Sequence, residues 1–326
     1  MATAASASVG GPAPFQVLAL DGGGYKGIFA AAVLAAVEQA YNVEITGHFD
    51  LVVGTSAGGI IALALAAGRR PYEIVDFFVA NGKDIFPHSP VRSIRWLLRA
   101  KYQSEPLSRA LRLVLGDAIL LDACIPLVVP SYELDNGEVH LFKTRHHERL
   151  THDWRIRMVD VAMATSAAPT YFPAHDIDSV RLIDGGLWAN NPVMVGLVEA
   201  VSLFGAKLED IRILSVGTTQ ETRKRSGKLA HGGLLAWRKD AMDLALRGQS
   251  AGSSAMAEHL LGKDRIVRID PAVPPNFFAL DRLTTDGLIS RANSISRHFS
   301  PAIEGFLHHT PIRPTTLNTR PSLAEA

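Results

Sequence analysis

The chain has 326 residues, of which 47% are apolar and 20% charged, an ordinary globular balance with ample material for a buried core. Its formal net charge of +1 at pH 7 argues against a general DNA- or RNA-binding protein, because such proteins carry a large excess of Lys and Arg. The single cysteine, Cys124, excludes an internal disulfide, fits a reducing, cytosolic setting and, within its apolar stretch, predicts a buried structural thiol.

Residues 1–14 predict a disordered leader. They contain no basic residue and no continuous apolar run, so they do not have the pattern of a secretory signal. The longest apolar run of the chain, residues 60–67, is too short to cross a bilayer. We therefore expect a soluble protein, or one that binds at a membrane surface.

A glycine-rich loop follows the first predicted strand, residues 15–20 (FQVLAL). The loop reads DGGGYKG at 21–27, and an alanine- and leucine-rich helix is predicted over 28–41. A loop of this kind, placed between a strand and a helix, directs several amide N–H groups at one point and so binds anions.

This loop has two interpretations. Gly22, Gly24 and Gly27 match the G-x-G-x-x-G pattern of dinucleotide-binding proteins, but that pattern requires an acidic residue at the end of the next strand, where this chain has a serine turn. The other interpretation is an oxyanion hole formed by the glycine amides of the loop beside Ser56. We favour it because the glycine loop and the serine turn leave the same edge of a parallel sheet.

The serine turn reads GTSAG at residues 54–58, between a predicted strand at 49–53 and an apolar helix. A serine on a sharp turn from strand to helix is typical of a nucleophile elbow. Gly54 and Gly58 are needed because the two backbones pass too close there for a Cβ. Ser56 is therefore a candidate nucleophile, and the helix N-terminus behind it helps to stabilise an oxyanion.

The middle of the chain predicts a helix opened by Pro71, a helix over 104–116 and a hairpin turn at 135–137 (DNG). The basic, tryptophan-bearing segment 92–101 predicts a surface helix that packs its apolar face on the core. The alternative is a segment that touches anionic lipid or caps the active site. The His146-His147 pair lacks further ligands at metal-site spacing, so no metal site is expected there.

Asp184 follows the end of a later predicted strand, as Ser56 follows the end of an earlier one. Residues 165–173 (TSAAPTYFP) predict a rigid loop that other backbone approaches closely, and a strand at 180–183 then ends in Asp184-Gly185-Gly186. Asp184 is poised at the same sheet edge as Ser56, although Asp-Gly is also a common turn.

The C-terminal third continues the alternation of helices and strands. A helix from Pro192, capped by Asn190 or Asn191, precedes a buried strand at 211–216, a basic loop at 221–228, a helical stretch at 234–261, a strand at 265–269 and a closing helix at 283–308. Pro301 predicts a kink or break near Phe299. No linker divides the chain, so we expect one domain over 15–309 and a flexible, Pro- and Thr-rich tail over 310–326.

A histidine after Asp184 would allow the Ser-Asp-His triad of an ordinary α/β-hydrolase esterase. The serine follows only one clear strand, earlier than that fold usually places it. None of the available histidines lies in a motif-like loop; they are His231, His259, His298, His308 and His309.

The motifs DGGGYKG, GTSAG, TSAAPTYFP and DGG, in this order and spacing, resemble the patatin-like phospholipases, a family of lipid acyl hydrolases. The resemblance extends over residues 15–219 and implies a three-layer α/β/α sandwich with a central, mostly parallel sheet. It also implies a Ser–Asp dyad that works without histidine. Ser56 would be the nucleophile and Asp184 the base, beside the oxyanion loop of Gly22, Gly23 and Gly24.

The same resemblance assigns supporting roles to the other motif residues, and it implies catalysis without a cofactor and independent of calcium. Lys26 stands where many relatives have arginine, so the charge is kept but the bidentate fork is lost. The supporting residues are Lys26, Gly27, Gly54, Gly58, Gly185 and Gly186.

A finer similarity is to the bacterial branch whose members are effectors of cyclic-oligonucleotide anti-phage systems. It implies a cytoplasmic protein that is activated by a cyclic di- or trinucleotide and then attacks phospholipids at the inner membrane. The basic loop 223–228 and the pair Arg238-Lys239 are candidates for phosphate binding, although surface solvation explains them equally well. A homo-oligomer is compatible with the sequence. The remaining alternative is a non-enzymatic nucleotide-sensing module on a hydrolase scaffold, against which the presence of both dyad residues argues.

Overall fold

The computed structural model describes residues 14–87, 99–221, 227–233, 237, 241–273 and 285–321. Several segments singled out in the sequence lie outside these ranges. They are nearly all of the leader, most of the basic segment 92–101, and the basic residues Arg223, Lys224, Arg225, Arg238 and Lys239.

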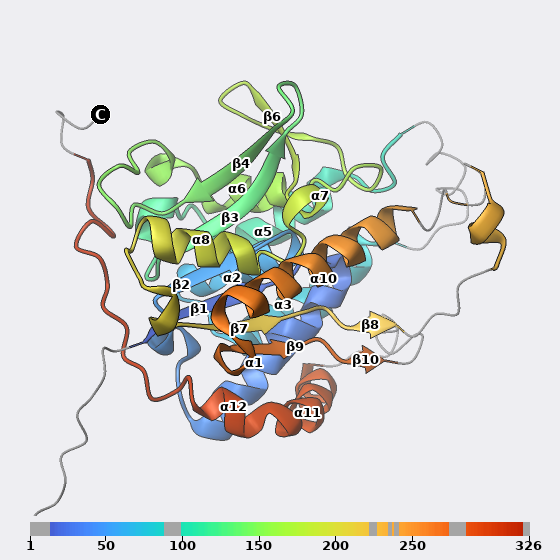
Figure 1. Cartoon of the computed structure of the whole chain (residues 1–326). Coiled ribbons are helices and arrows are strands. Elements are labelled where there is room, and N and C mark those ends of the chain that lie inside the picture. Colours follow the sequence, from blue (N-terminus) through green and yellow to red (C-terminus); the bar gives the residue numbers. More distant parts are fainter. Residues whose placement is uncertain are drawn as a thin grey trace, which may run out of the picture.

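An eight-stranded mixed sheet forms the middle layer of the molecule (Figure 1). Its hydrogen-bonded order is β5-β6-β3-β2-β1-β7-β9, and β4 also pairs with β3. The run β3-β2-β1-β7-β9 is parallel, and the pairs that involve β4, β5 and β6 are antiparallel. The strands are β1 (Phe15–Leu20), β2 (Leu51–Gly54), β3 (Leu127–Glu133), β4 (Glu138–Lys143), β5 (His175–Ile177), β6 (Val180–Asp184), β7 (Ile211–Val216) and β9 (Ile266–Ile269).

Helices cover both faces of this sheet (Figure 1). The helices α8 (Val193–Ser202) and α10 (Ala241–Leu261) lie on one face. The opposite face carries α1 (Ile28–Tyr41), α2 (Ala57–Ala66), α3 (Pro71–Ile85), α5 (Ser104–Leu115), α6 (Met158–Thr165), α11 (Thr285–Ser296) and α12 (Ser300–Glu304). A separate two-stranded parallel sheet joins β8 (Gln220–Glu221) to β10 (Ala272–Val273).

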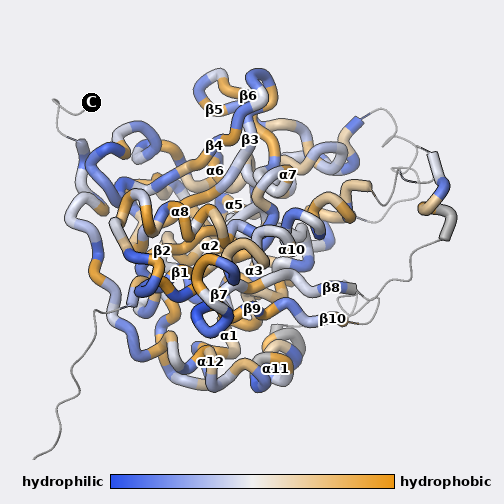
Figure 2. The backbone as a smooth tube through the Cα atoms, viewed as in Figure 1, coloured by the Kyte–Doolittle hydropathy of each residue, from blue (hydrophilic) through white to orange (hydrophobic). Residues whose placement is uncertain are grey.

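Alternate side chains of each central strand fill two separate apolar cores, one on each face of the sheet. In β1, Leu18 and Leu20 belong to the core with α1 and α2, whereas Val17 and Ala19 belong to the core with α8. A strand that is buried on both faces reads as a largely continuous apolar run, and the central strands are accordingly mostly apolar (Figure 2). The predicted three-layer α/β/α sandwich with a mostly parallel sheet is confirmed.

The prediction of a buried thiol at Cys124 is wrong. Cys124 is exposed, although its neighbours Ala123 and Ile125 are fully buried. The apolar stretch around it does not enter the sheet as one strand, because β3 begins only at Leu127 and the preceding residues form a loop. In that loop Cys124 Sγ contacts the carbonyl oxygen of Leu65 at 3.5 Å.

The closing helix is broken where Pro301 predicted it. The helix α11 ends at Ser296, a 3-10 turn covers Arg297–Phe299, and α12 starts at Ser300 with the proline in its first turn. Residues 310–321, the described part of the segment for which a flexible tail is expected, contact the domain. Arg313 donates hydrogen bonds to the carbonyl oxygens of Phe49 and Thr46, at 2.7 and 2.6 Å.

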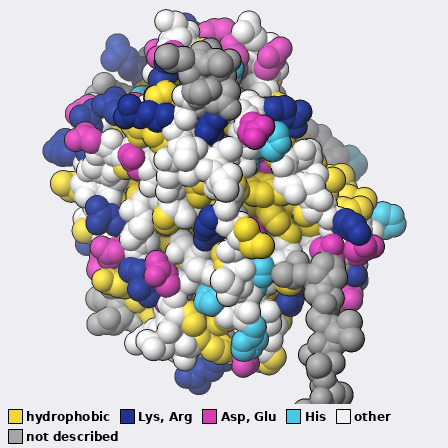
Figure 3. Space-filling view, turned by 90° about the vertical axis from the view of Figure 1, so that its left-hand side faces the viewer, with side chains coloured by type: hydrophobic (Ala, Val, Ile, Leu, Met, Phe, Trp, Pro, Cys, Tyr) yellow, Lys and Arg dark blue, Asp and Glu magenta, His cyan; other side chains and the backbone are white. Residues whose placement is uncertain are grey.

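The face of the molecule in Figure 3 carries Lys and Arg side chains interspersed with Asp and Glu. This mixture of signs agrees with the net charge near zero. Among the described residues, no helix combines the length and the apolar character that a bilayer span requires.

Candidate active site

Two strands meet end to end along one edge of β3, and the two candidate catalytic side chains lie at this junction. The strand β4 occupies one edge of β3 from Val128 to Glu133, so β2 and β6 share the other edge. Since β2 runs parallel to β3 and β6 runs antiparallel to it, their carboxyl ends point at each other. Ser56 follows the end of β2, and Asp184 is the last residue of β6.

Ser56 lies on a strained turn, as the nucleophile-elbow pattern predicts. Its φ of 53° is in the left-handed region that a residue with a Cβ rarely adopts, and α2 begins at the next residue. The turn is tightly packed, because a Cβ on Gly54 would lie 2.3 Å from the carbonyl oxygen of Gly58, and one on Gly58 would lie 2.2 Å from that of Leu20. Both positions therefore require glycine.

The side chains of Ser56 and Asp184 are hydrogen-bonded to each other. Ser56 Oγ donates to Asp184 Oδ2 at 2.7 Å, and both residues are buried, with 9% and 5% of their surface exposed. The other carboxylate oxygen accepts the amide of Gly186 at 2.7 Å. The backbone of the serine is fixed as well, since its amide donates to Thr165 Oγ1 at 3.0 Å, and that hydroxyl donates to the carbonyl oxygen of Pro130. The geometry is that of a nucleophile held by a base.

Burial raises the pKa of Asp184 to about 6, because removal from water disfavours the ionised carboxylate. The hydrogen bonds from Ser56 and Gly186 act in the opposite direction. At neutral pH the carboxylate is mostly ionised, and its raised pKa makes it a stronger proton acceptor than an exposed aspartate. A base of this kind can take a proton from a serine hydroxyl that already points at it.

The glycine loop lies directly beside Ser56. A Cβ on Gly22 would lie 3.3 Å from Ser56 Cβ and 2.6 Å from Asn190 Oδ1. The amide of Gly22, one of the three predicted to form the oxyanion hole, donates to the carbonyl oxygen of Asn190 at 2.8 Å. Gly23 and Gly24 are exposed, and their amides have no hydrogen-bond acceptor among the described residues. These two N–H groups are the ones free to hold an oxyanion.

The other motif residues pack the two loops against each other. A Cβ on Gly27 would lie 2.6 Å from that of Ala57, and a Cβ on Gly185 would lie 2.2 Å from the carbonyl oxygen of Pro130. Lys26 is partly buried in the 3-10 turn Gly24–Gly27 that follows the loop. The close approach that these glycines permit brings the serine turn, the glycine loop and the end of β6 to one place.

The family model of the patatin-like phospholipases matches residues 18–197. The chain belongs to this family. A cGAMP-activated phospholipase of Pseudomonas aeruginosa is 35% identical over 307 residues, which cover 90% of this chain and 92% of the relative. A cGAMP-activated phospholipase of Vibrio cholerae is 38% identical over 63% of this chain and 64% of its own length. Patatin-like protein 2 of Arabidopsis thaliana is 29% identical over 68% of this chain and 64% of the relative.

This patatin-like phospholipase is therefore an enzyme of the carboxylic ester hydrolase class, as the ordered motifs predicted. Within the described ranges, no histidine is hydrogen-bonded to Ser56 or Asp184. Of the five candidates, His309 is held by Asp50, with 2.7 Å between Nε2 and Oδ2. Asp50 precedes β2, so this pair lies at the amino end of the strand, whereas Ser56 follows the carboxyl end.

His146, one of the two adjacent histidines for which no metal site is expected, contacts a carboxylate and an aromatic ring. His146 is buried, with its Nε2 2.9 Å from Glu199 Oε1 and its ring stacked on Phe204. Burial lowers the pKa of His146, against the opposing effect of Glu199. Among the described residues, no group of three or more His, Cys, Asp or Glu side chains is arranged to hold a metal ion.

The sequence did not identify three residues that shape the site. Thr165 was part of the loop expected to be closely approached, but its role in holding the serine amide was not foreseen. Asn190 was expected only as one of two possible helix caps, and the cap is Asn191, whose Oδ1 accepts the amide of Val193. The carbonyl oxygen of Asn190 instead accepts the amide of Gly22. Thr218, just after β7, donates to the carbonyl oxygen of Gly22. No local pattern marks these residues, since each acts on a partner that is distant in sequence.

Proposed function

We propose that this enzyme hydrolyses fatty-acyl esters of membrane phospholipids through Ser56 and Asp184. Asp184 takes the proton of Ser56 Oγ as the oxygen attacks the ester carbonyl, and the amides of Gly23 and Gly24 donate to the oxyanion that forms. Asp184 then gives the proton to the departing lysophospholipid oxygen, which leaves an acyl-enzyme. Water deprotonated by the same carboxylate attacks the acyl group, the fatty acid departs, and the proton returns to Ser56.

The hydrogen bond of 2.7 Å from Ser56 Oγ to Asp184 Oδ2 is the observation that carries this proposal. It joins a hydroxyl on a strained turn to a buried base whose pKa is raised to about 6. Proton transfer and oxyanion stabilisation are both provided by groups of the chain, so we propose that no calcium ion or other cofactor takes part.

We further propose that a cyclic nucleotide activates the enzyme, in anti-phage defence. The relatives named cGAMP-activated phospholipase support this, above all the one that matches over 92% of its length. The natural setting would be the cytoplasm, with the active enzyme peripheral to the inner membrane where its substrate lies.

The test is fatty-acid release from phospholipid vesicles by the purified chain, with and without cGAMP and a panel of other cyclic di- and trinucleotides. We expect release by the wild type, enhancement by one cyclic nucleotide, and no effect of EDTA. Ser56→Ala and Asp184→Asn should each lose at least about 10³-fold in kcat. Ser202→Ala is the matched control, because Ser202 is an exposed helix residue that bonds only to the carbonyl oxygen of Val198.

A fluorophosphonate probe separates this proposal from its two rivals. The probe should label the wild type and Ser202→Ala but not Ser56→Ala. A protein that is never labelled, under any ligand condition, would be a nucleotide-sensing module on an inactive scaffold. A large loss of turnover on replacing one of the five histidines by alanine would indicate a triad and count against the dyad. Full activity without any nucleotide, unchanged by the panel, would leave a constitutive lipase.

A further inference from the structure

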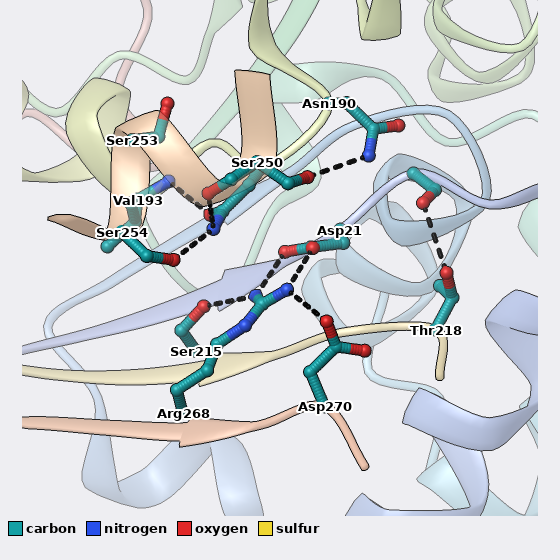
Figure 4. A network of polar contacts seen from close by, with 12 residues as sticks. Asp21, Asn190, Val193, Ser215, Thr218, Ser250, Ser253, Ser254, Arg268 and Asp270 are labelled. Carbon is teal, nitrogen blue, oxygen red and sulfur yellow. Dashed lines mark hydrogen bonds and ion pairs between the residues drawn. The ribbon is translucent and has the colours of Figure 1, made fainter. Parts of the chain in front are cut away.

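The side chain of Thr218 lies against the glycine loop (Figure 4). Its Oγ1 donates to the carbonyl oxygen of Gly22 at 3.3 Å. A Cβ on Gly23 would lie 2.2 Å from Thr218 Oγ1 and 2.7 Å from Thr218 Cγ2, so the threonine occupies the space where Gly23 has no side chain. Thr218 therefore both bonds to one residue of the loop and packs on the next.

The contact with Gly22 determines where the Gly23 amide points. The carbonyl of Gly22 and the N–H of Gly23 belong to the same planar trans peptide, and they point in opposite directions. A hydroxyl that holds the carbonyl oxygen on one side therefore directs the N–H to the other side. Three consecutive glycines have no Cβ to restrict their backbone, so this orientation has to come from contacts with the rest of the protein.

Asp21, the first residue of the glycine loop, is fixed by an ion cluster that also contacts Gly217, the residue before Thr218. Arg268 on β9 reaches across β7 and donates to both carboxylate oxygens of Asp21, at 2.7 and 2.5 Å, and to Ser215 Oγ at 2.7 Å (Figure 4). It also donates to Asp270 Oδ2 at 2.9 Å. A Cβ on Gly217, the residue before Thr218, would lie 2.4 Å from Asp270 Oδ1 and 2.8 Å from Arg268 Nη2. The cluster thus supports both the start of the glycine loop and the start of the threonine loop.

We propose that Thr218, supported by the Asp21–Arg268–Asp270 cluster, is a positioning residue that aims the Gly23 amide at the oxyanion of the reaction. This proposal rests on the proposed function, because it concerns the same ester hydrolysis at Ser56. Thr218 touches no reacting atom. It acts through the Gly22–Gly23 peptide, whose N–H is one of the two that stabilise the negative charge. Asn190 fixes the other side of Gly22 by accepting its amide at 2.8 Å.

Thr218→Val and Thr218→Ser separate the hydrogen bond from the packing. Valine keeps the shape that fills the space beside Gly23 and removes the hydroxyl, whereas serine keeps the hydroxyl and removes a methyl group. We expect Thr218→Val to lower kcat about tenfold or more with KM within about twofold of the wild type, since a misdirected oxyanion donor weakens transition-state binding only. Thr218→Ser should stay within about threefold of the wild type.

Thr46→Val is the matched control for the chemical change. Thr46 is buried, whereas Thr218 is partly buried; Thr46 lies before the amino end of β2, and its hydroxyl donates to Glu44. This variant should hydrolyse at the wild-type rate. Thermal unfolding of all variants reveals any general loss of stability, which would affect Thr46→Val and Thr218→Val alike.

Arg268→Lys tests the cluster, because lysine keeps the charge but cannot bind both oxygens of Asp21 in a bidentate manner. We expect a loss in kcat of about the same size as for Thr218→Val. The double variant should lose less than the product of the two single losses, because both residues act on the same peptide.

The rate of fluorophosphonate labelling at Ser56 gives a second measure that does not depend on phospholipid. We expect Thr218→Val to slow labelling by a factor similar to its loss in kcat. The proposal is overturned by a Thr218→Val variant within threefold of the wild type, by a Thr218→Ser variant that is equally impaired, or by a loss confined to KM. A wild type that is labelled but releases no fatty acid would overturn the assignment of phospholipid as the substrate. The labelling rates of the variants would then still test the role of Thr218. A wild type whose Ser56 is never labelled would overturn both.

Discussion

Replacing Asp184 by asparagine should abolish activity and at the same time stabilise the protein. Asparagine has nearly the same shape, so its side-chain oxygen can still accept the amide of Gly186, and its NH₂ group can donate to Ser56 Oγ. What the substitution removes is a buried charge, because Asp184 is 5% exposed and its hydrogen bonds come from an amide and a hydroxyl. The experiment measures how much burying that charge lowers the free energy of unfolding.

The magnitude follows from the pKa. Burial raises the pKa of Asp184 from its ordinary value of 3.8 to about 6, and each step of one in pKa corresponds to about 1.4 kcal/mol, so ionisation costs the folded state about 3 kcal/mol. The folded state holds this proton more tightly than the unfolded state. The cost is therefore absent below pH 3.8, grows between pH 3.8 and about 6, and is complete above that range. Asp184→Asn should accordingly gain about 3 kcal/mol in the free energy of unfolding at pH 8, and nothing at pH 3.5.

Urea unfolding of the wild type and of Asp184→Asn at a series of pH values measures this difference directly. Asp176→Asn is the matched control, because Asp176 lies on the same sheet with 73% of its side chain exposed. Its free energy of unfolding should change by less than about 0.5 kcal/mol at any pH. An Asp184→Asn variant no more stable than the wild type at pH 8, or one whose gain is the same at every pH, would refute the reasoning.

Two further predictions concern the same site. First, kcat/KM for ester hydrolysis should rise with pH through a midpoint near 6 and then level off, since only the ionised form of Asp184 accepts the proton of Ser56; a rate that is flat between pH 5 and 8 would contradict this. Second, Gly58→Ala should be destabilised by at least about 1–3 kcal/mol and lose most of its activity, because the new Cβ would lie 2.2 Å from the carbonyl oxygen of Leu20. Gly47→Ala, where no atom lies within 4 Å of the new Cβ, is the control in the same unfolding and activity assays and should behave as the wild type.

Much of the site could be predicted because its main parts are local. The serine on its elbow depends on Gly54 and Gly58, a few residues away, and the strand and helix around them are marked by composition. A loop of glycine amides between a strand and a helix was predicted in the same way, for Gly22, Gly23 and Gly24. The hydrogen bond that occupies the amide of Gly22 was not, because its acceptor Asn190 is distant in sequence. The exposure of Cys124 was not foreseen, because it depends on where the neighbouring strand β3 begins. The contacts of residues 310–321 were not foreseen either, because they depend on which part of the domain surface the chain lies against.

The sequence by itself determined the alternation of strands and helices and the two loops that carry Ser56 and the glycine run, because strand and helix periodicity and glycine turns are encoded within a few residues of each other. The layered arrangement of these elements was implied by the resemblance of the ordered motifs to a family. Only the tertiary structure decided that β2 and β6 meet end to end on one edge of β3, which brings Asp184 to 2.7 Å from Ser56 and buries it enough to raise its pKa. The same holds for Asn190 and Thr218, which act on Gly22 from distant parts of the chain. A hydrogen bond between distant segments depends on the register and direction of the strands that carry them, and no local pattern of residues specifies either.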